Sequence, residues 1–178
     1  MKTKIFTIAG LFALILVLTG CQQAPKQDPN AAAEEKNKIA MQKVSDAFNT
    51  GNIEGLENYV SENVVEHSPD PAIKTTGLQG LKDMITSYRV SFPYMKMTAL
   101  TMIAEGDMVI AHFNMKGTNT GPMGSMPATN KSFDINGVDI VKFADGKGVE
   151  HWGYYEEAKM MMQLGMMPSP QEGGEVKK

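Results

Sequence analysis

The hydrophobic pattern of the chain changes near Pro93, and this change limits the folds that the chain can adopt. Before Pro93, apolar residues recur every three to four positions, as they do in amphipathic helices. After Pro93, apolar and polar residues alternate through long segments that are separated by short turns, which is typical of antiparallel strands. Helices followed by an antiparallel sheet predict an α+β fold, and 178 residues suffice for one domain but hardly for two.

The segment before Pro93 is predicted to form two helices with a short helical piece between them. Residues 32–50 place apolar side chains on one face and are followed by a glycine. Asn52 can cap the short piece, which is expected to reach Val60. The next helix is expected over residues 78–92, because a proline disfavours the helical conformation of the residue before it.

The segment after Pro93 is predicted to form four strands and a last short helix. The strands are expected at residues 94–104, 108–118, 132–143 and 149–155. Glycine-containing turns join the first strand to the second and the third to the fourth, as in hairpins. Within the third strand Asn136 and Gly137 break the alternation, which predicts a β-bulge. The last helix is expected from Glu156 to Leu164.

The N-terminus has the features of a bacterial lipoprotein signal peptide. Lys2 and Lys4 form a positive n-region, and residues 5–18 are almost all apolar but too few for a comfortable bilayer span. Leu18-Thr19-Gly20-Cys21 follows directly and resembles a lipobox, in which the cysteine receives a diacylglyceryl group and becomes the first residue of the mature chain. We therefore expect lipidation at Cys21, a membrane anchor and a place in the cell envelope. An ordinary secretory signal with a chance cysteine is the alternative.

Four parts of the chain are distinguished on this basis. They are a signal peptide at 1–20, Cys21 with a flexible tether to residue 31, a folded domain at 32–167 and a disordered tail at 168–178. Loss of Lys2 and Lys4 with the signal peptide takes the formal net charge from −3 to −5. No basic patch remains, so nucleic acid is not an expected partner. Gln22 is not an acidic retention signal, which allows an outer-membrane destination.

A series of short motifs follows an order and a spacing that resemble a known family. They are Gly77-Leu78-Gln79-Gly80-Leu81-Lys82, Phe92-Pro93, Ala104-Glu105-Gly106-Asp107, Gly117-Thr118-x-Thr120-Gly121, Asp145-Gly146-Lys147, Val149-Glu150-His151-Trp152 and Gln163-Leu164-Gly165. Together they resemble the SnoaL-like polyketide (ester) cyclase family of the nuclear-transport-factor-2-like superfamily over most of residues 33–166. The resemblance implies a cone-shaped, cystatin-like fold in which a curved antiparallel sheet wraps on N-terminal helices. It also implies a homodimer formed through the outer face of the sheet.

The resemblance further implies a site for acid/base chemistry. In the family, an acidic residue four positions after the tryptophan acts as general acid/base in an intramolecular aldol closure, and Glu156 occupies that position here. Asn119 stands where the family often has a histidine, and Tyr94 stands where it has the aspartate of a Phe-Pro-Asp motif. Glu156 is therefore the candidate catalytic residue.

Strand alternation supplies candidates for ligand binding, because the open end of a cone is a natural cavity. Glu150, Trp152 and Tyr154 share one face of the last strand with Glu156. If this face lines the cavity, burial among aromatic side chains should raise the pKa of Glu156. The alternative is a solvated Glu156 at the start of the last helix, where an acidic residue is common.

The other polar candidates come from the rest of the domain. The residues expected to line the cavity are His67, Tyr88, His112, Asn114 and Asn119. His151 is on the opposite face of its strand from Trp152, so we expect it at the surface or in the dimer interface. The three histidines show no metal-ligand spacing, and neither a metal nor another cofactor is expected.

Methionine is abundant, with 15 residues that include several clusters. Thioethers are soft ligands suited to Cu(I), but methionine more often fills irregular cores and adaptable pockets. Three hypotheses follow for the function. The first is a lipid-anchored domain that holds a small, largely apolar molecule in its cone, with acid/base catalysis left open. The second is a non-catalytic binding or carrier lipoprotein, and the third is a methionine-based copper binder.

Overall fold

The computed structural model describes residues 29–168. In chain order the elements are α1 (Ala31–Thr50), η1 (Leu56–Asn58), β1 (Val60–Glu66), α2 (Gly77–Ser91), β2 (Lys96–Glu105), β3 (Met108–Thr118), β4 (Ser132–Ala144), β5 (Lys147–Tyr155) and α3 (Glu157–Gln163). The signal peptide, Cys21, most of the predicted tether and the tail after Pro168 lie outside the described residues. None of the helices within the described part is both long and apolar enough to cross a bilayer.

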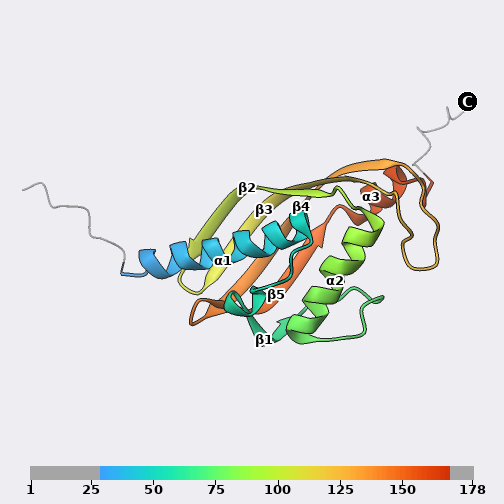
Figure 1. Ribbon diagram of the computed structural model, residues 1–178. Helices are drawn as coiled ribbons and strands as arrows, with labels where there is room; N and C mark the ends of the chain where they lie inside the picture. The colour runs from blue at the N-terminus through green and yellow to red at the C-terminus, as the bar shows by residue number, and fades with distance from the viewer. Residues whose placement is uncertain (1–28, 169–178) are drawn as a thin grey trace, which may run out of the picture.

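The five strands form one curved, open sheet in the order β1-β5-β4-β3-β2. Neighbours from β2 to β5 pair antiparallel, and β1 pairs parallel with β5 at the edge. The helices α1 and α2 lie over the same face of this sheet, and α3 lies at the end of the sheet that is far from the start of α1 (Figure 1). We call the face under α1 and α2 the inner face. This arrangement confirms the predicted α+β fold.

Most of the predicted helices and strands lie within two residues of their observed bounds, and the short piece before β1 is the main exception. It forms only the single 3-10 turn Leu56–Asn58, and Val60 already belongs to β1. The reason is the neighbouring strand: Val60 pairs with Gly148 of β5, whose backbone N–H donates to Tyr59 O at 2.9 Å. Pairing with β5 therefore draws into the sheet a residue that was predicted to be helical.

The core lies between the inner face of the sheet and the two long helices. Alternate residues of β3 (Val109, Ala111, Phe113 and Met115) are buried, and Phe133 and Ile135 continue this layer on β4. The helices contribute Ala40, Met41, Ala47, Phe48 and Ile85 to the opposite side. Because each large apolar side chain contributes about 1.5–3 kcal/mol when it leaves water, this layer holds the helices on the sheet.

The β-bulge predicted at Asn136 and Gly137 is absent, because β4 pairs with β3 in unbroken register from Ser132 to Lys142. Gly137 has a different role. A Cβ at this position would collide with the ring of Phe113 and lie 2.7 Å from Tyr154 O. The glycine therefore makes room for a core aromatic residue. The register shifts that involve β4 and β2 occur instead between Lys142 and Phe143 and between Ala99 and Thr101.

Candidate functional site

A cavity of about 690 Å³ opens between α1, α2, β1 and the inner face of β3–β5. This volume lies within the range of small-molecule sites in proteins. Apolar side chains form most of the wall, among them Met41, Phe48, Leu81, Met84, Phe113 and Val141. The cavity therefore suits a molecule with a largely apolar body.

The inner face of β5 carries His151, Gly153 and Tyr155, and all three line the cavity. Their partners on β4 fit this orientation, since His151 pairs with Val141 and Gly153 pairs with Asp139, and both partners also line the cavity. The expectation that His151 lies at the surface or in a dimer interface is wrong.

The residues that were predicted to line the cavity from β5 lie on its outer face instead. Glu150, Trp152 and Tyr154 do not contribute to the cavity wall. The physical reason is a β-bulge just after the β4–β5 turn. Phe143 pairs with Gly148, but Lys142 pairs with Glu150, so one extra residue inverts the two faces of β5.

His151 lies between two carboxylates that come from the neighbouring strands. Its Nδ1 is 2.5 Å from Glu66 Oε2 on β1, and its Nε2 is 3.2 Å from Asp139 Oδ1 on β4. Glu66 Oε1 also accepts a hydrogen bond from Ser68 N at 2.8 Å. With a carboxylate at each ring nitrogen, both nitrogens are donors and the ring is an imidazolium. We call His151, Glu66 and Asp139 the histidine cluster.

The electrostatics of the histidine cluster keep the ring charged. Burial by itself lowers the pKa of His151, but the hydrogen bonds and charges of Asp139 and Glu66 outweigh it and raise the pKa to about 9. For Glu66, burial raises the pKa, but the hydrogen bond and charge of His151, the Ser68 amide and the charge of His67 together outweigh burial and lower the pKa. At neutral pH the cluster therefore contains one cation and two anions, and His151 is a proton donor rather than a base.

Tyr88 and Tyr155 add phenol groups to the cavity wall. Burial raises the pKa of Tyr88 well above its ordinary value, and Tyr155 with the charges of Asp70 and Glu157 adds to this effect. Burial also raises the pKa of Tyr155. Both phenols are therefore neutral at pH 7, and they are hydrogen-bonded to each other. Tyr88 is a cavity residue, as the sequence pattern suggested.

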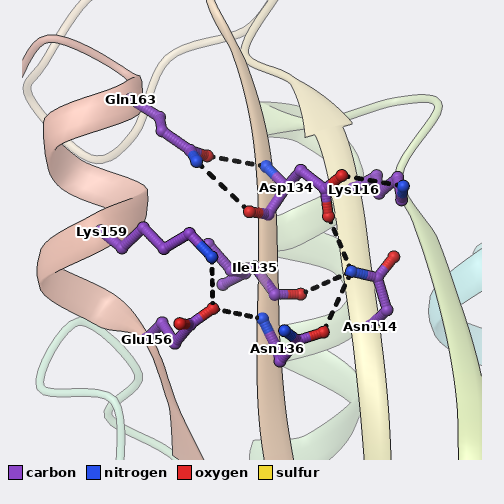
Figure 2. Close-up of polar contacts among 8 residues, drawn as sticks. All are labelled: Asn114, Lys116, Asp134, Ile135, Asn136, Glu156, Lys159 and Gln163. Carbon is purple, nitrogen blue, oxygen red and sulfur yellow. Dashed lines mark hydrogen bonds and ion pairs between the residues drawn. The ribbon is translucent and has the colours of Figure 1, made fainter.

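Glu156 lies outside the cavity, at the start of α3. Its Oε2 accepts hydrogen bonds from Lys159 Nζ and from Asn136 N, each at 2.8 Å (Figure 2). Lys159 first and the Asn136 amide second hold the pKa of Glu156 below its usual value. The raised pKa expected for a buried acid is therefore contradicted, and the solvated alternative describes this residue.

His112 and Asn114 of β3 also lie on the outer face, away from the cavity wall. His112 is exposed. Asn114 Nδ2 donates to Asp134 Oδ1, to Ile135 O and to Asn136 Oδ1 at 2.7–3.2 Å (Figure 2). The cavity-lining role predicted for the pair is wrong, because the inner positions of β3 are the alternate residues of the apolar core layer.

His67 and Asn119 do not line the cavity either. The ring of His67 stacks on Trp152, with 4.3 Å between centroids, and its Nε2 is 3.0 Å from Glu150 Oε2. Asn119 is completely buried in the loop after β3. Its amide donates to Ser91 O and Gly121 O and accepts from Thr129 N, so it holds this loop against the end of α2.

Metal binding finds no support in the described part of the chain, where no group of three or more His, Cys, Asp or Glu side chains could hold an ion. Met41, Met95, Met115 and Met160 are buried in the core, and Met123 and Met166 pack against it. These contacts are what packing residues make.

The family model for the SnoaL-like polyketide cyclases matches residues 38–164. The chain belongs to this family. Its fold is also similar to that of solved structures, among them TsrD from Streptomyces laurentii, with 23% identity, a TM-score of 0.68 and coverage of 75% of this chain and 97% of that one. No curated protein sequence matches the chain significantly.

Two further solved structures, one of them a SnoaL-like polyketide cyclase, show the same likeness. IdmH from Streptomyces antibioticus is 25% identical, with a TM-score of 0.64 and coverage of 72% of this chain and 98% of that one. A SnoaL-like polyketide cyclase from Agrobacterium tumefaciens is 16% identical, with a TM-score of 0.61 and coverage of 72% and 97%. The described fold therefore spans nearly the whole length of these proteins.

The histidine cluster predicts a pH-dependent stability. Because folding raises the pKa of His151 from 6.5 to about 9, its contribution is complete below pH 6.5 and is lost as the pH rises through 9. The loss should be about 3 kcal/mol in the free energy of unfolding. Chemical denaturation at a series of pH values measures it. The loss between pH 6.5 and 9.5 should be much smaller in His151→Gln and unchanged in the exposed control His112→Gln. An equal loss in wild type and His151→Gln would contradict the charged cluster.

Asn119 is predicted to act on stability and not on ligand binding. Asn119→Ala leaves the half-buried Thr129 N–H and Gly121 O without this partner, whereas Ser91 O keeps two backbone donors, so the free energy of unfolding should fall by about 2 kcal/mol. Asn114→Ala, which removes an amide with three bonds at a half-buried position, should cost less because water can replace them. Denaturant unfolding compares the two. A larger loss for Asn114→Ala would contradict this role.

Proposed function

We propose that this chain is a lipid-anchored SnoaL-like protein of the bacterial cell envelope that binds a small, largely apolar molecule. The observation that carries the proposal is the cavity of about 690 Å³, whose wall is mostly apolar and holds one group of hydrogen-bonded charges. In such a site, affinity and ligand orientation come from different parts of the wall. The apolar surface supplies most of the binding free energy, and the few polar groups fix the orientation of the ligand.

A second candidate function, acid/base catalysis on the bound molecule, is favoured by the histidine cluster. If a ligand carbonyl replaces Asp139 Oδ1, which is 3.2 Å from His151 Nε2, the imidazolium can donate that proton to the carbonyl oxygen, while a neighbouring carboxylate removes a proton from the adjacent carbon. The electron pair of the broken C–H bond then moves toward the oxygen, which gives an enol. Cyclase and isomerase reactions both begin this way. In this scheme His151 takes the place that the family resemblance gave to Glu156.

The anchor is the part of the proposal that rests on sequence alone. The positive n-region, the apolar stretch and the Leu18-Thr19-Gly20-Cys21 motif support lipid attachment at Cys21. Acyl chains contribute about 0.8 kcal/mol for each buried methylene, so two or three of them hold a protein on a membrane. The domain would then lie close to a membrane, where apolar molecules concentrate.

The outer face of the sheet supports a homodimer. Ile103, Ile110, Ile140 and Trp152 are successive cross-strand partners from β2 to β5, so they form one apolar row across this face. Ile103 and Ile110 are 62% and 43% exposed, which is unusual for large apolar residues in a row. A second copy that presents the same row would cover it in an isologous contact.

Lipid anchoring predicts a change of location in Cys21→Ser. Full-length wild-type protein should fractionate with the membrane and carry the mass of a diacylated or triacylated cysteine. Cys21→Ser should lose the acyl mass and leave the membrane fraction, and the control Gln22→Ala should behave like wild type. Membrane fractionation with intact mass spectrometry checks both. Membrane-bound Cys21→Ser without acyl mass would contradict the anchor.

The bound molecule and the dimer can be tested together by native mass spectrometry. The mature chain, residues 21–178 with Cys21→Ser, would be purified from a periplasm without denaturation. A dimer with a co-purified organic molecule is expected, and copper in its place would favour the methionine-based alternative. A monomer at tens of micromolar would contradict the dimer.

Catalysis is tested once a carbonyl compound is identified as the bound molecule. His151→Gln should then abolish its conversion, whereas Glu156→Gln should retain it, because Glu156 does not reach the cavity. Conversion that survives in His151→Gln would leave binding or carriage as the function.

A further inference from the structure

We propose that the molecule in this cavity carries a positive charge, as an organic ammonium group joined to an apolar or aromatic body. This inference rests on the proposed binding function and names the class of ligand that the same cavity would take. It follows from the sign of the charges on the wall, from a carboxylate oxygen of Asp139 that has no hydrogen-bond partner in the described part of the chain, and from the aromatic residues that line the same cavity.

The charged groups on the cavity wall are nearly all acidic. Glu62, Glu66, Asp70 and Asp139 line the cavity, and His151 is the single opposing charge. Within the described residues, no lysine or arginine contributes to the wall. Glu62 is exposed to solvent, and the other three carboxylates still outnumber the one imidazolium, so the cavity has a net negative charge. Apolar walls of low dielectric strengthen this field.

Three basic residues of α2 and β4 are directed to partners outside the cavity. Arg89 of α2 donates to Asn49 O at 3.2 Å, and Lys82 of α2 pairs with Glu57 at 3.5 Å. Lys142 of β4 pairs with Glu150 on the outer face at 3.4 Å. None of these cations lines the cavity, so they leave its negative charge uncompensated from within.

Among these carboxylates, Asp139 of the histidine cluster has an oxygen without a hydrogen-bond partner among the described residues. Both oxygens of Glu66 are used, by His151 and by Ser68 N. Asp139 uses Oδ1 for His151, and its Oδ2 has no hydrogen-bond partner among residues 29–168. Asp139 lies on the inner face of β4, and its side chain is only 22% exposed. An ammonium N–H that points at Oδ2 would make a charge-assisted hydrogen bond in a poorly solvated place.

Aromatic rings complete a surface that suits a cation. Tyr59, Tyr88, Phe113 and Tyr155 line the cavity together with the carboxylates. The face of an aromatic ring attracts an ammonium group, and this attraction strengthens when water is excluded. Carboxylates and aromatic faces both disfavour an anionic ligand, so a fatty acid or another carboxylate should be rejected.

Three probes with the same ring test the charge preference: 1-naphthylmethylammonium, 1-naphthylmethanol and 1-naphthoate. Each is titrated at pH 7 by calorimetry into the mature chain with Cys21→Ser, which keeps every described residue. The ammonium probe should bind at least about ten-fold more tightly than the alcohol, a difference of about 1.4 kcal/mol. The carboxylate should bind most weakly.

Variants that remove a single charge show which carboxylate causes the preference for the ammonium probe. Asp139→Asn should reduce the ratio of ammonium to alcohol affinity to about three-fold or less, roughly half of the electrostatic preference in free energy. Asp70→Asn and Glu62→Gln should each reduce it to a smaller extent, and they keep the test informative if Asp139→Asn does not fold. Glu105→Gln removes a charge from an exposed residue outside the cavity wall and should leave the ratio unchanged.

Three outcomes would overturn the inference. Equal affinities for ammonium and alcohol would show that the cavity binds apolar molecules without regard to charge, and the proposed binding function would stand. Tightest binding of the carboxylate would show that the cavity prefers anions, and the proposed binding function would again stand. Absence of binding for all three probes at concentrations up to about ten millimolar would overturn both the inference and the proposed binding function. A dissociation constant above this limit corresponds to a binding free energy of less than about 3 kcal/mol.

Discussion

The unbroken antiparallel ladder between β3 and β4 is the constraint on which the rest of the molecule depends. It runs from Met108 opposite Lys142 to Thr118 opposite Ser132 without a shift. Because side chains alternate along both strands, this register decides which apolar residues meet α1 and α2 and which face outward. The helices pack on the inner residues, and the space they do not fill is the cavity. A glycine at 137 keeps that register compatible with the ring of Phe113.

The histidine cluster connects the edge strand β1 to the rest of the sheet and also lines the cavity. Glu66 and His151 are register partners in the parallel β1–β5 pair, and His67 N donates to His151 O at 2.9 Å. The ion pairs therefore help to hold the edge strand that closes one side of the cavity. Buried charges are costly to desolvate, and a cluster of this kind is retained only with well-placed partners. Here the same partners leave Asp139 Oδ2 without a hydrogen-bond partner among residues 29–168.

Membership in the SnoaL-like family does not bring the family's acid/base residue to the cavity of this chain. Glu156 is neutralised by Lys159 and bound to the backbone of β4, so it connects α3 to the sheet. Asn119, at a position where the family often has a histidine, fastens a loop. The polar groups of the cavity are others, on β1, β4 and β5. The fold is shared with the family, but the chemistry has to be argued from these residues.

The sequence by itself determined the α+β class, the extent of the long helices and the positions of the strands β2 to β5, because these follow from local periodicity and from turn residues. Tyr88 could be found in this way, since its helix has one apolar face. The orientation of β5 could not. A regular hairpin after Asp145-Gly146 would turn Glu150 and Trp152 inward, and only the β-bulge at Val149 of β5 turns His151 inward instead. Nor could the sequence place Glu66 beside His151, 85 residues away, because that contact exists only once β1 pairs with β5. Register and long-range pairing are decided by the packing of the whole sheet, so the tertiary structure alone determined the site.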